Sequence, residues 1–235
     1  MRTHLCLIPV LIVCKTSPLH AQYDEPSKYE SPVARYVHFG IMQRDFQPRS
    51  SNTAPDSAVI SYDRWMPMIG LHQGMFDISF GYAQFSLRGK SRSTIFFGVM
   101  ASNEILLTGS RQGALILPIM LSADFTKAEG LRSEREDFNI ASVGIGGGLK
   151  FRFNQESVDF SIHATQFVQY SFEGFSSGNG FSAATVAEVS MLINRALVFD
   201  GMALGYRFRF QTWSMSNENF DYRVVAHGPY VGILF

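Results

Sequence analysis

The chain has 235 residues, and its 20 acidic and 20 basic side chains leave no formal net charge at pH 7. Because no long block of basic residues occurs, nothing in the sequence indicates nucleic-acid binding. Glycine (20) and phenylalanine (21) are abundant. No apolar run reaches the about 20 residues that a membrane-spanning helix needs. All-β barrels of about 200 to 250 residues fold as one domain, so the length permits a single barrel.

The amino-terminal segment has the pattern of a secretory signal peptide. Arg2 precedes an apolar run, Leu5–Cys14, and Ala21 provides a small residue at a cleavage point. We therefore expect residues 1–21 to be removed, which would leave a mature chain without cysteine, disulfide or cysteine–metal site. Lipid attachment at Cys14 is the alternative, disfavoured by the bulky residue before it. Residues 22–34 are expected to form a short periplasmic leader.

The rest of the chain, residues 35–235, alternates with a period of two. In Val158–Tyr170 the even positions are mostly apolar and the odd positions mostly polar, as a β-strand requires. The same alternation occurs in residues 76–83, 143–153, 187–194 and 204–210. We predict ten strands, with eight as the alternative, near residues 35–46, 63–72, 75–87, 93–107, 112–123, 138–153, 157–170, 184–195, 200–213 and 222–235. Prolines within these strands are expected to mark bulges.

The two faces of these strands differ in a way that favours a membrane barrel. The polar face is rich in small residues between its charges, which suits a narrow lumen, and the apolar face carries many bulky phenylalanines. Connections alternate between long and short as in outer-membrane barrels, and only the third, Arg88–Arg92, is shorter than this pattern predicts. The predicted fold is all-β, a closed antiparallel up-and-down transmembrane barrel. A secreted soluble barrel of lipocalin type, with its apolar face inside, is the alternative.

Two segments resemble a known family. Leu115–Leu121 followed by Val143–Leu149 is similar to the middle of small porin-like bacterial outer-membrane β-barrel proteins. The last strand, Gly228–Phe235, resembles the terminal strand of outer-membrane barrels, so Tyr230, Ile233 and Phe235 are interpreted as a signal for the barrel-assembly machinery. The resemblance implies a Gram-negative outer-membrane location and carries no catalytic residues.

Charged residues on the predicted lumen face form the main candidate site. Acidic and basic side chains must be paired or hydrated there, because an isolated buried charge is too costly. They would form an ion-pair network that fills the lumen or, alternatively, the selective wall of a narrow pore. The set is Asp77, Lys150, Arg152, Asp159, His163, Glu188, Arg207 and Arg209. Aromatic residues expected in the interfacial girdles are Tyr36, Trp65, Tyr170, Tyr206, Tyr222 and Tyr230.

Residues that suggest catalysis are few. His163 and Thr165 share a face and faintly resemble a lipid-deacylase pair, but they lie on the polar face, so a hydrogen-bonded interior pair is the preferred interpretation. The histidines lack metal-ligand spacing, and we expect no metal, cofactor or enzymatic activity.

The predicted function is an integral outer-membrane barrel with a structural or porin-like role, in contact with outer-membrane lipid. Its external loops would make the specific contacts, with a partner that the sequence does not identify. The alternatives are a narrow passive channel for small polar or amphiphilic solutes, and an outer-membrane enzyme acting on lipid or peptide.

Overall fold

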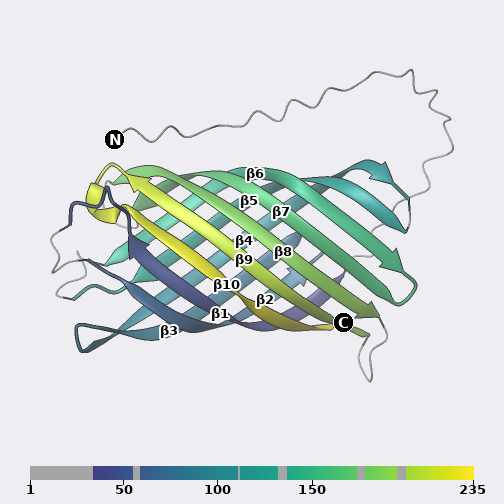
Figure 1. Cartoon of the computed structure of the whole chain (residues 1–235), viewed down its shortest axis with the longest axis horizontal. Coiled ribbons are helices and arrows are strands. Elements are labelled where there is room, and N and C mark those ends of the chain that lie inside the picture. The colour runs from purple at the N-terminus through teal and green to yellow at the C-terminus, as the bar shows by residue number, and fades with distance from the viewer. Residues whose placement is uncertain (1–33, 55–58, 111, 132–136, 174–177, 195–199) are drawn as a thin grey trace, which may run out of the picture. The chain divides into compact units, whose positions relative to one another are not determined.

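The computed structural model describes residues 34–54, 59–110, 112–131, 137–173, 178–194 and 200–235. They form a closed antiparallel β-barrel (Figure 1). Its strands are β1 (Arg35–Pro48), β2 (Tyr62–Gln73), β3 (Phe76–Leu87), β4 (Lys90–Gly109), β5 (Gly113–Ala128), β6 (Phe138–Gln155), β7 (Val158–Glu173), β8 (Asn179–Asn194), β9 (Gly201–Met215) and β10 (Tyr222–Leu234), with a 3-10 helix, η2 (Glu218–Phe220), before β10. The expected signal peptide and nearly all of the leader lie outside the described residues.

Each strand pairs with its neighbours in the sequence, and β1 pairs with β10 to close the barrel. This confirms the predicted fold and the count of ten strands. We call the end where β1 begins and β10 ends the terminal end, and the opposite end, which carries η2, the distal end (Figure 1). No helix among the described residues is long and apolar enough to cross a membrane.

The short third connection is a two-residue hairpin turn at the distal end. Arg88 and Gly89 join β3 to β4, and both have positive φ, at 51° and 80°. Two successive positive φ angles match the right-handed twist of the flanking strands, which is why a tight turn is stable there. The exception to the loop-length pattern therefore has a local backbone cause.

The apolar face of the strands points outward, as predicted. In β3, the side chains of Phe76, Ile78 and Phe80 are exposed, while those of Asp77 and Ser79 are buried. The same division holds in β6 and β7, where Val143, Ile145, Leu149, Phe151, Ile162, Val168 and Tyr170 are exposed. This orientation is the reverse of a soluble barrel, so the lipocalin-type alternative is wrong.

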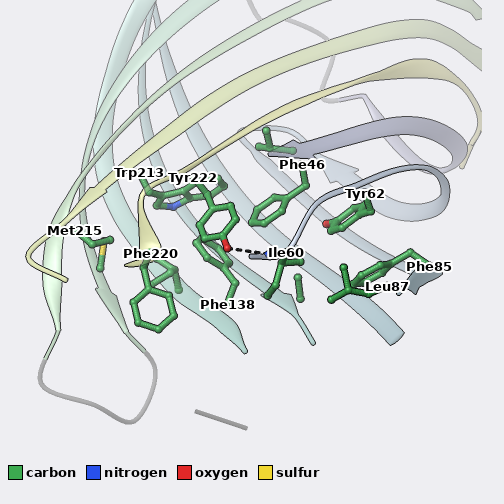
Figure 2. Packing of buried hydrophobic residues seen from close by; sticks show 13 residues of the cluster. Phe46, Ile60, Tyr62, Phe85, Leu87, Phe138, Trp213, Met215, Phe220 and Tyr222 are labelled. Carbon is green, nitrogen blue, oxygen red and sulfur yellow. Dashed lines mark hydrogen bonds between the residues drawn. The ribbon is translucent and has the colours of Figure 1, made fainter. Parts of the chain in front are cut away.

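The distal end of the lumen contains a large group of buried apolar residues, which was not predicted from the sequence. We call this group of buried residues the distal cluster (Figure 2). Phe46 stacks between Tyr62 and Tyr222, with ring centroids 5.2 and 4.7 Å apart, and Phe138 meets Trp213 edge-on at 5.1 Å. The distal cluster consists of Phe46, Ile60, Tyr62, Phe85, Leu87, Ala128, Phe138, Ile140, Trp213, Met215, Phe220, Tyr222 and Val224.

Two details of the strand prediction need correction. Tyr36, Tyr222 and Tyr230 are buried inside the barrel, so they cannot belong to an interfacial girdle, whereas Trp65, Tyr170 and Tyr206 are exposed on its outside. The prolines do not shift the strand register: the one shift in the described ladders lies between Leu106 and Thr108 of β4. A proline removes one ladder donor, and here it interrupts pairing without adding a residue.

Candidate functional site: a charge network in the lumen

Below the distal cluster, Arg207 is the centre of a buried charge group. Its Nη1 and Nη2 donate to the two carboxylate oxygens of Asp77, both at 3.1 Å, and its Nε donates to Oε2 of Glu188 at 2.6 Å. The Tyr230 hydroxyl donates to the other Glu188 oxygen at 2.7 Å. Strands β3, β8, β9 and β10 supply these residues, so the group ties distant parts of the barrel wall together across the lumen.

Two histidines complete the surroundings of Asp77. Nε2 of His38 lies 3.8 Å and Nδ1 of His72 lies 3.6 Å from the same Asp77 oxygen. The His72 ring stacks on Tyr36 with centroids 4.8 Å apart. Two carboxylates thus share one permanent cation, and the histidines are placed to add positive charge when they are protonated.

Arg209 forms a second group, one inward-facing position closer to the distal cluster. Its Nη2 donates to Oδ2 of Asp124 at 2.7 Å and to Oε1 of Gln211 at 2.8 Å. Gln169 and Gln211 also donate to Asp124, at 2.6 and 3.1 Å. Asp124 therefore accepts from one cation and two amides, which satisfies a buried carboxylate well.

Two further ion pairs lie toward the terminal end. Nε of Arg152 donates to both oxygens of Asp159, at 2.9 and 2.7 Å, and both residues are buried. Nζ of Lys150 lies 2.6 Å from Glu104, and this pair is partly open to solvent. Each cation is matched by one carboxylate, so these pairs are electrically neutral.

His163 lies on the inner face between two charged neighbours. It pairs in register with Glu188 of β8 and with Lys150 of β6. The buried Thr165 hydroxyl lies 3.5 Å from the sulfur of Met120, and no hydrogen bond between His163 and Thr165 occurs among the described contacts. The described contacts therefore include neither the hydrogen-bonded interior pair preferred from the sequence nor the dyad that the two residues faintly suggest.

All eight predicted lumen residues lie on inner-face positions, and all of them except His163 form ion pairs with one another or with unpredicted acids. Asp124, Gln169 and Gln211 were not predicted as site residues, although they lie at inward positions that the alternation along β5, β7 and β9 indicates. Tyr230 was likewise not predicted to lie in the lumen. Among the described residues, no group of three or more histidine, cysteine or acidic side chains could hold a metal ion.

No protein-family model and no curated protein matches the chain. Three solved structures illustrate its similarities. The outer membrane protease OmpT from Escherichia coli is 9% identical, with 86% of this chain and 96% of that chain covered and a TM-score of 0.38. The β domain of the Bordetella autotransporter BrkA is 9% identical (86% and 100% covered, TM-score 0.37), and the outer membrane protein OprG from Pseudomonas aeruginosa is 12% identical (86% and 93% covered, TM-score 0.30). Scores this low carry no argument about function. The chain's own geometry, an even number of antiparallel strands closed into a barrel with an apolar exterior, is the architecture of bacterial outer-membrane β-barrels.

Proposed function

We propose that this protein is an integral outer-membrane β-barrel with a structural or porin-like role, whose lumen is closed along its axis. The outward apolar side chains support the membrane location, because a large contiguous apolar exterior is unfavourable in water. Outer-membrane lipid is then its immediate partner. Export by a cleaved signal peptide and recognition of Tyr230, Ile233 and Phe235 by the barrel-assembly machinery belong to the same proposal.

The distal cluster is the observation that carries the closed lumen. Phe46, Phe138 and Trp213 are fully buried and contact one another across the barrel interior (Figure 2). Hydrated ions cross a barrel only through a wetted path, and a packed aromatic group leaves none. In the ion pairs below it, the charged side chains bond one another directly, so we interpret them as groups that occupy the lumen.

Conductance of the purified barrel in a planar lipid bilayer tests this proposal. The unaltered protein should give no steady single-channel current. Phe138→Ala removes a ring from the centre of the distal cluster and should produce current steps if that cluster is the block. Val168→Ala, on the outer face, is the matched control and should remain silent. Steady conductance from the unaltered protein would overturn the closed lumen.

The passive channel remains the second candidate because of one feature at the terminal end. The Lys150 and Glu104 side chains are 22% and 30% exposed, so polar solutes can reach this part of the barrel. Current that is carried by the unaltered protein and lost in Lys150→Met would favour this candidate. The enzyme hypothesis predicts instead that His163→Ala abolishes a hydrolytic activity on lipid or peptide.

A further inference from the structure

The ladder between β2 and β3 is incomplete. The two strands pair from Gln73↔Phe76 to Met68↔Gly81, and there the pairing stops. Residues 62–67 of β2 still pair with β1, and residues 82–87 of β3 still pair with β4. Pro67, which has no backbone N–H, is the first residue beyond the last pair. We call these two unpaired stretches the β2–β3 split.

Side chains, in place of backbone hydrogen bonds, connect the two strands across the split. The Tyr62 ring stacks on Phe85 at 4.4 Å, and its hydroxyl lies 2.8 Å from Oγ1 of Thr94. Nearer the last pair, Met66 packs with Ala83 in a buried apolar group. Side-chain contacts rearrange more easily than a hydrogen-bonded ladder, so this is the one seam of the described barrel that can open without breaking a strand pair.

Arg44 lies on the inner face at the level of this group. It is only 4% exposed, yet no described carboxylate is within ion-pair distance of it. Nη2 donates to Oγ1 of Thr126 at 3.1 Å, the guanidinium lies 5.2 Å from the Phe96 ring centroid, and Nε has no hydrogen-bond partner among the described residues. A buried guanidinium without an anion is costly, and an orphaned donor on it adds to the cost.

A second arginine increases this imbalance. Arg64 of β2 stands directly opposite Arg44 of β1 in the ladder, and like charges in that relation repel. Arg64 is exposed and belongs to the β2 side of the split. The other lumen arginines, Arg152, Arg207 and Arg209, all have carboxylate partners. Arg44 and Arg64 therefore place two cations on one face of this ladder, whereas the acidic residues of the adjacent pair, Asp45 and Asp63, lie on the other face.

The outer surface around the split indicates where the split lies relative to the lipid bilayer. Asp63 and Gln84 are exposed there, and Trp65 beside them is 54% exposed. Polar side chains next to an outward tryptophan are typical of the boundary between lipid headgroups and hydrocarbon. A molecule that reaches Arg44 through the split from this boundary would have one end in lipid.

We propose that the β2–β3 split is a lateral binding site for an amphiphile with a compact anionic headgroup. The headgroup, a carboxylate or a phosphate, binds between Arg44 and Arg64, and the apolar tail lies outward along Trp65. Arg44 is almost fully enclosed, which favours a small headgroup. The inference rests on the proposed membrane location, because the tail is accommodated by lipid.

Isothermal titration of the purified barrel in a neutral maltoside detergent tests the site. Dodecanoate should bind saturably, and dodecanol, with the same tail and no charge, should not. Arg44→Gln should weaken dodecanoate binding by about tenfold to a hundredfold, as expected for a lost hydrogen bond to a charged group. Arg223→Gln removes an equivalent charge from an exposed arginine at the distal end of β10 and is the matched control.

The outcomes distinguish a carboxylate from a phosphate headgroup, and failure of the binding site from failure of the membrane barrel. If dodecyl phosphate binds more tightly than dodecanoate and its binding depends on Arg44, the proposed site is supported and its headgroup is a phosphate. Equal binding of dodecanol, or unchanged binding in both Arg44→Gln and the exposed Arg64→Gln, would overturn the proposal, as would equal binding of acetate. Each variant is first checked for heat-dependent gel mobility: a barrel that keeps its mobility but binds nothing refutes this inference alone, whereas lost mobility in the unaltered protein refutes the membrane barrel.

Discussion

Replacing Arg207 with methionine should severely destabilise the barrel. Methionine has a similar length, but it removes the one guanidinium that bonds both Asp77 and Glu188, each of which is 7% exposed. Breaking one buried ion pair costs about 3–5 kcal/mol, because the remaining charge is left without a partner. Two carboxylates lose their cation here, so the cost should lie at the upper end of that range. Domains are stable by only about 5–15 kcal/mol, so this is a third or more of the total.

Urea unfolding of the barrel in detergent micelles, followed by tryptophan fluorescence, measures this loss. The triple variant Asp77→Asn, Arg207→Met, Glu188→Gln removes all three charges and should recover most of the stability, because uncharged groups of similar size can replace a buried ion pair. Arg223→Met, at an exposed arginine, is the control and should change the free energy of unfolding by less than about 0.5 kcal/mol. If Arg207→Met unfolds within about 1 kcal/mol of the unaltered protein, or if the triple variant is no better than the single one, the network is not a unit of stability.

Three further changes test the orientation of the two faces and the close packing of neighbouring strands. Val168→Arg places a charge on the outer face, where Val168 is 64% exposed, and should cost about 2–4 kcal/mol in urea unfolding from lipid if this position is near the bilayer midplane; a cost near zero would place it in water. Brominated lipid should quench the fluorescence of the exposed Trp65 but not that of the fully buried Trp213, so quenching should disappear in Trp65→Phe and persist in Trp213→Phe; the opposite result would reverse the faces. Gly148→Ala would drive a methyl group into the backbone of β7 and should lower stability in the same unfolding assay, whereas an unchanged midpoint would show that the strands can separate there.

The alternation of side chains made the fold predictable. In β7, Asp159, Thr165 and Gln169 are buried, as the pattern indicated. Ile162, Val168 and Tyr170, at the alternate positions, are exposed. The beginning of β8 was not predictable in the same way. Asn179 and Gly180 read as loop, but they pair with Phe172 of β7 and Met215 of β9, and pairing with two neighbours outweighs local preference.

The distal cluster was missed because the inner face changes character along each strand. In β9 the inward positions change from Arg207 and Arg209 to Trp213 and Met215. The inner face is therefore neither uniformly charged nor uniformly apolar. The same change occurs in β3, from Asp77 to Leu87, toward the same end of the barrel. Reading the inward-facing positions of every strand up to its distal end would have predicted the distal cluster. The pairing of Asp77 with Arg207, 130 residues apart, depends on barrel closure and could not be derived from alternation.

Mobility of the protein from isolated outer membranes on SDS gels, with and without boiling, tests the central claim most directly. A closed barrel with an apolar exterior resists unfolding in detergent, so the unboiled protein should migrate faster than the boiled protein. A protein that is released without detergent and migrates equally in both lanes would contradict the membrane barrel, and its outward apolar side chains would then require another partner.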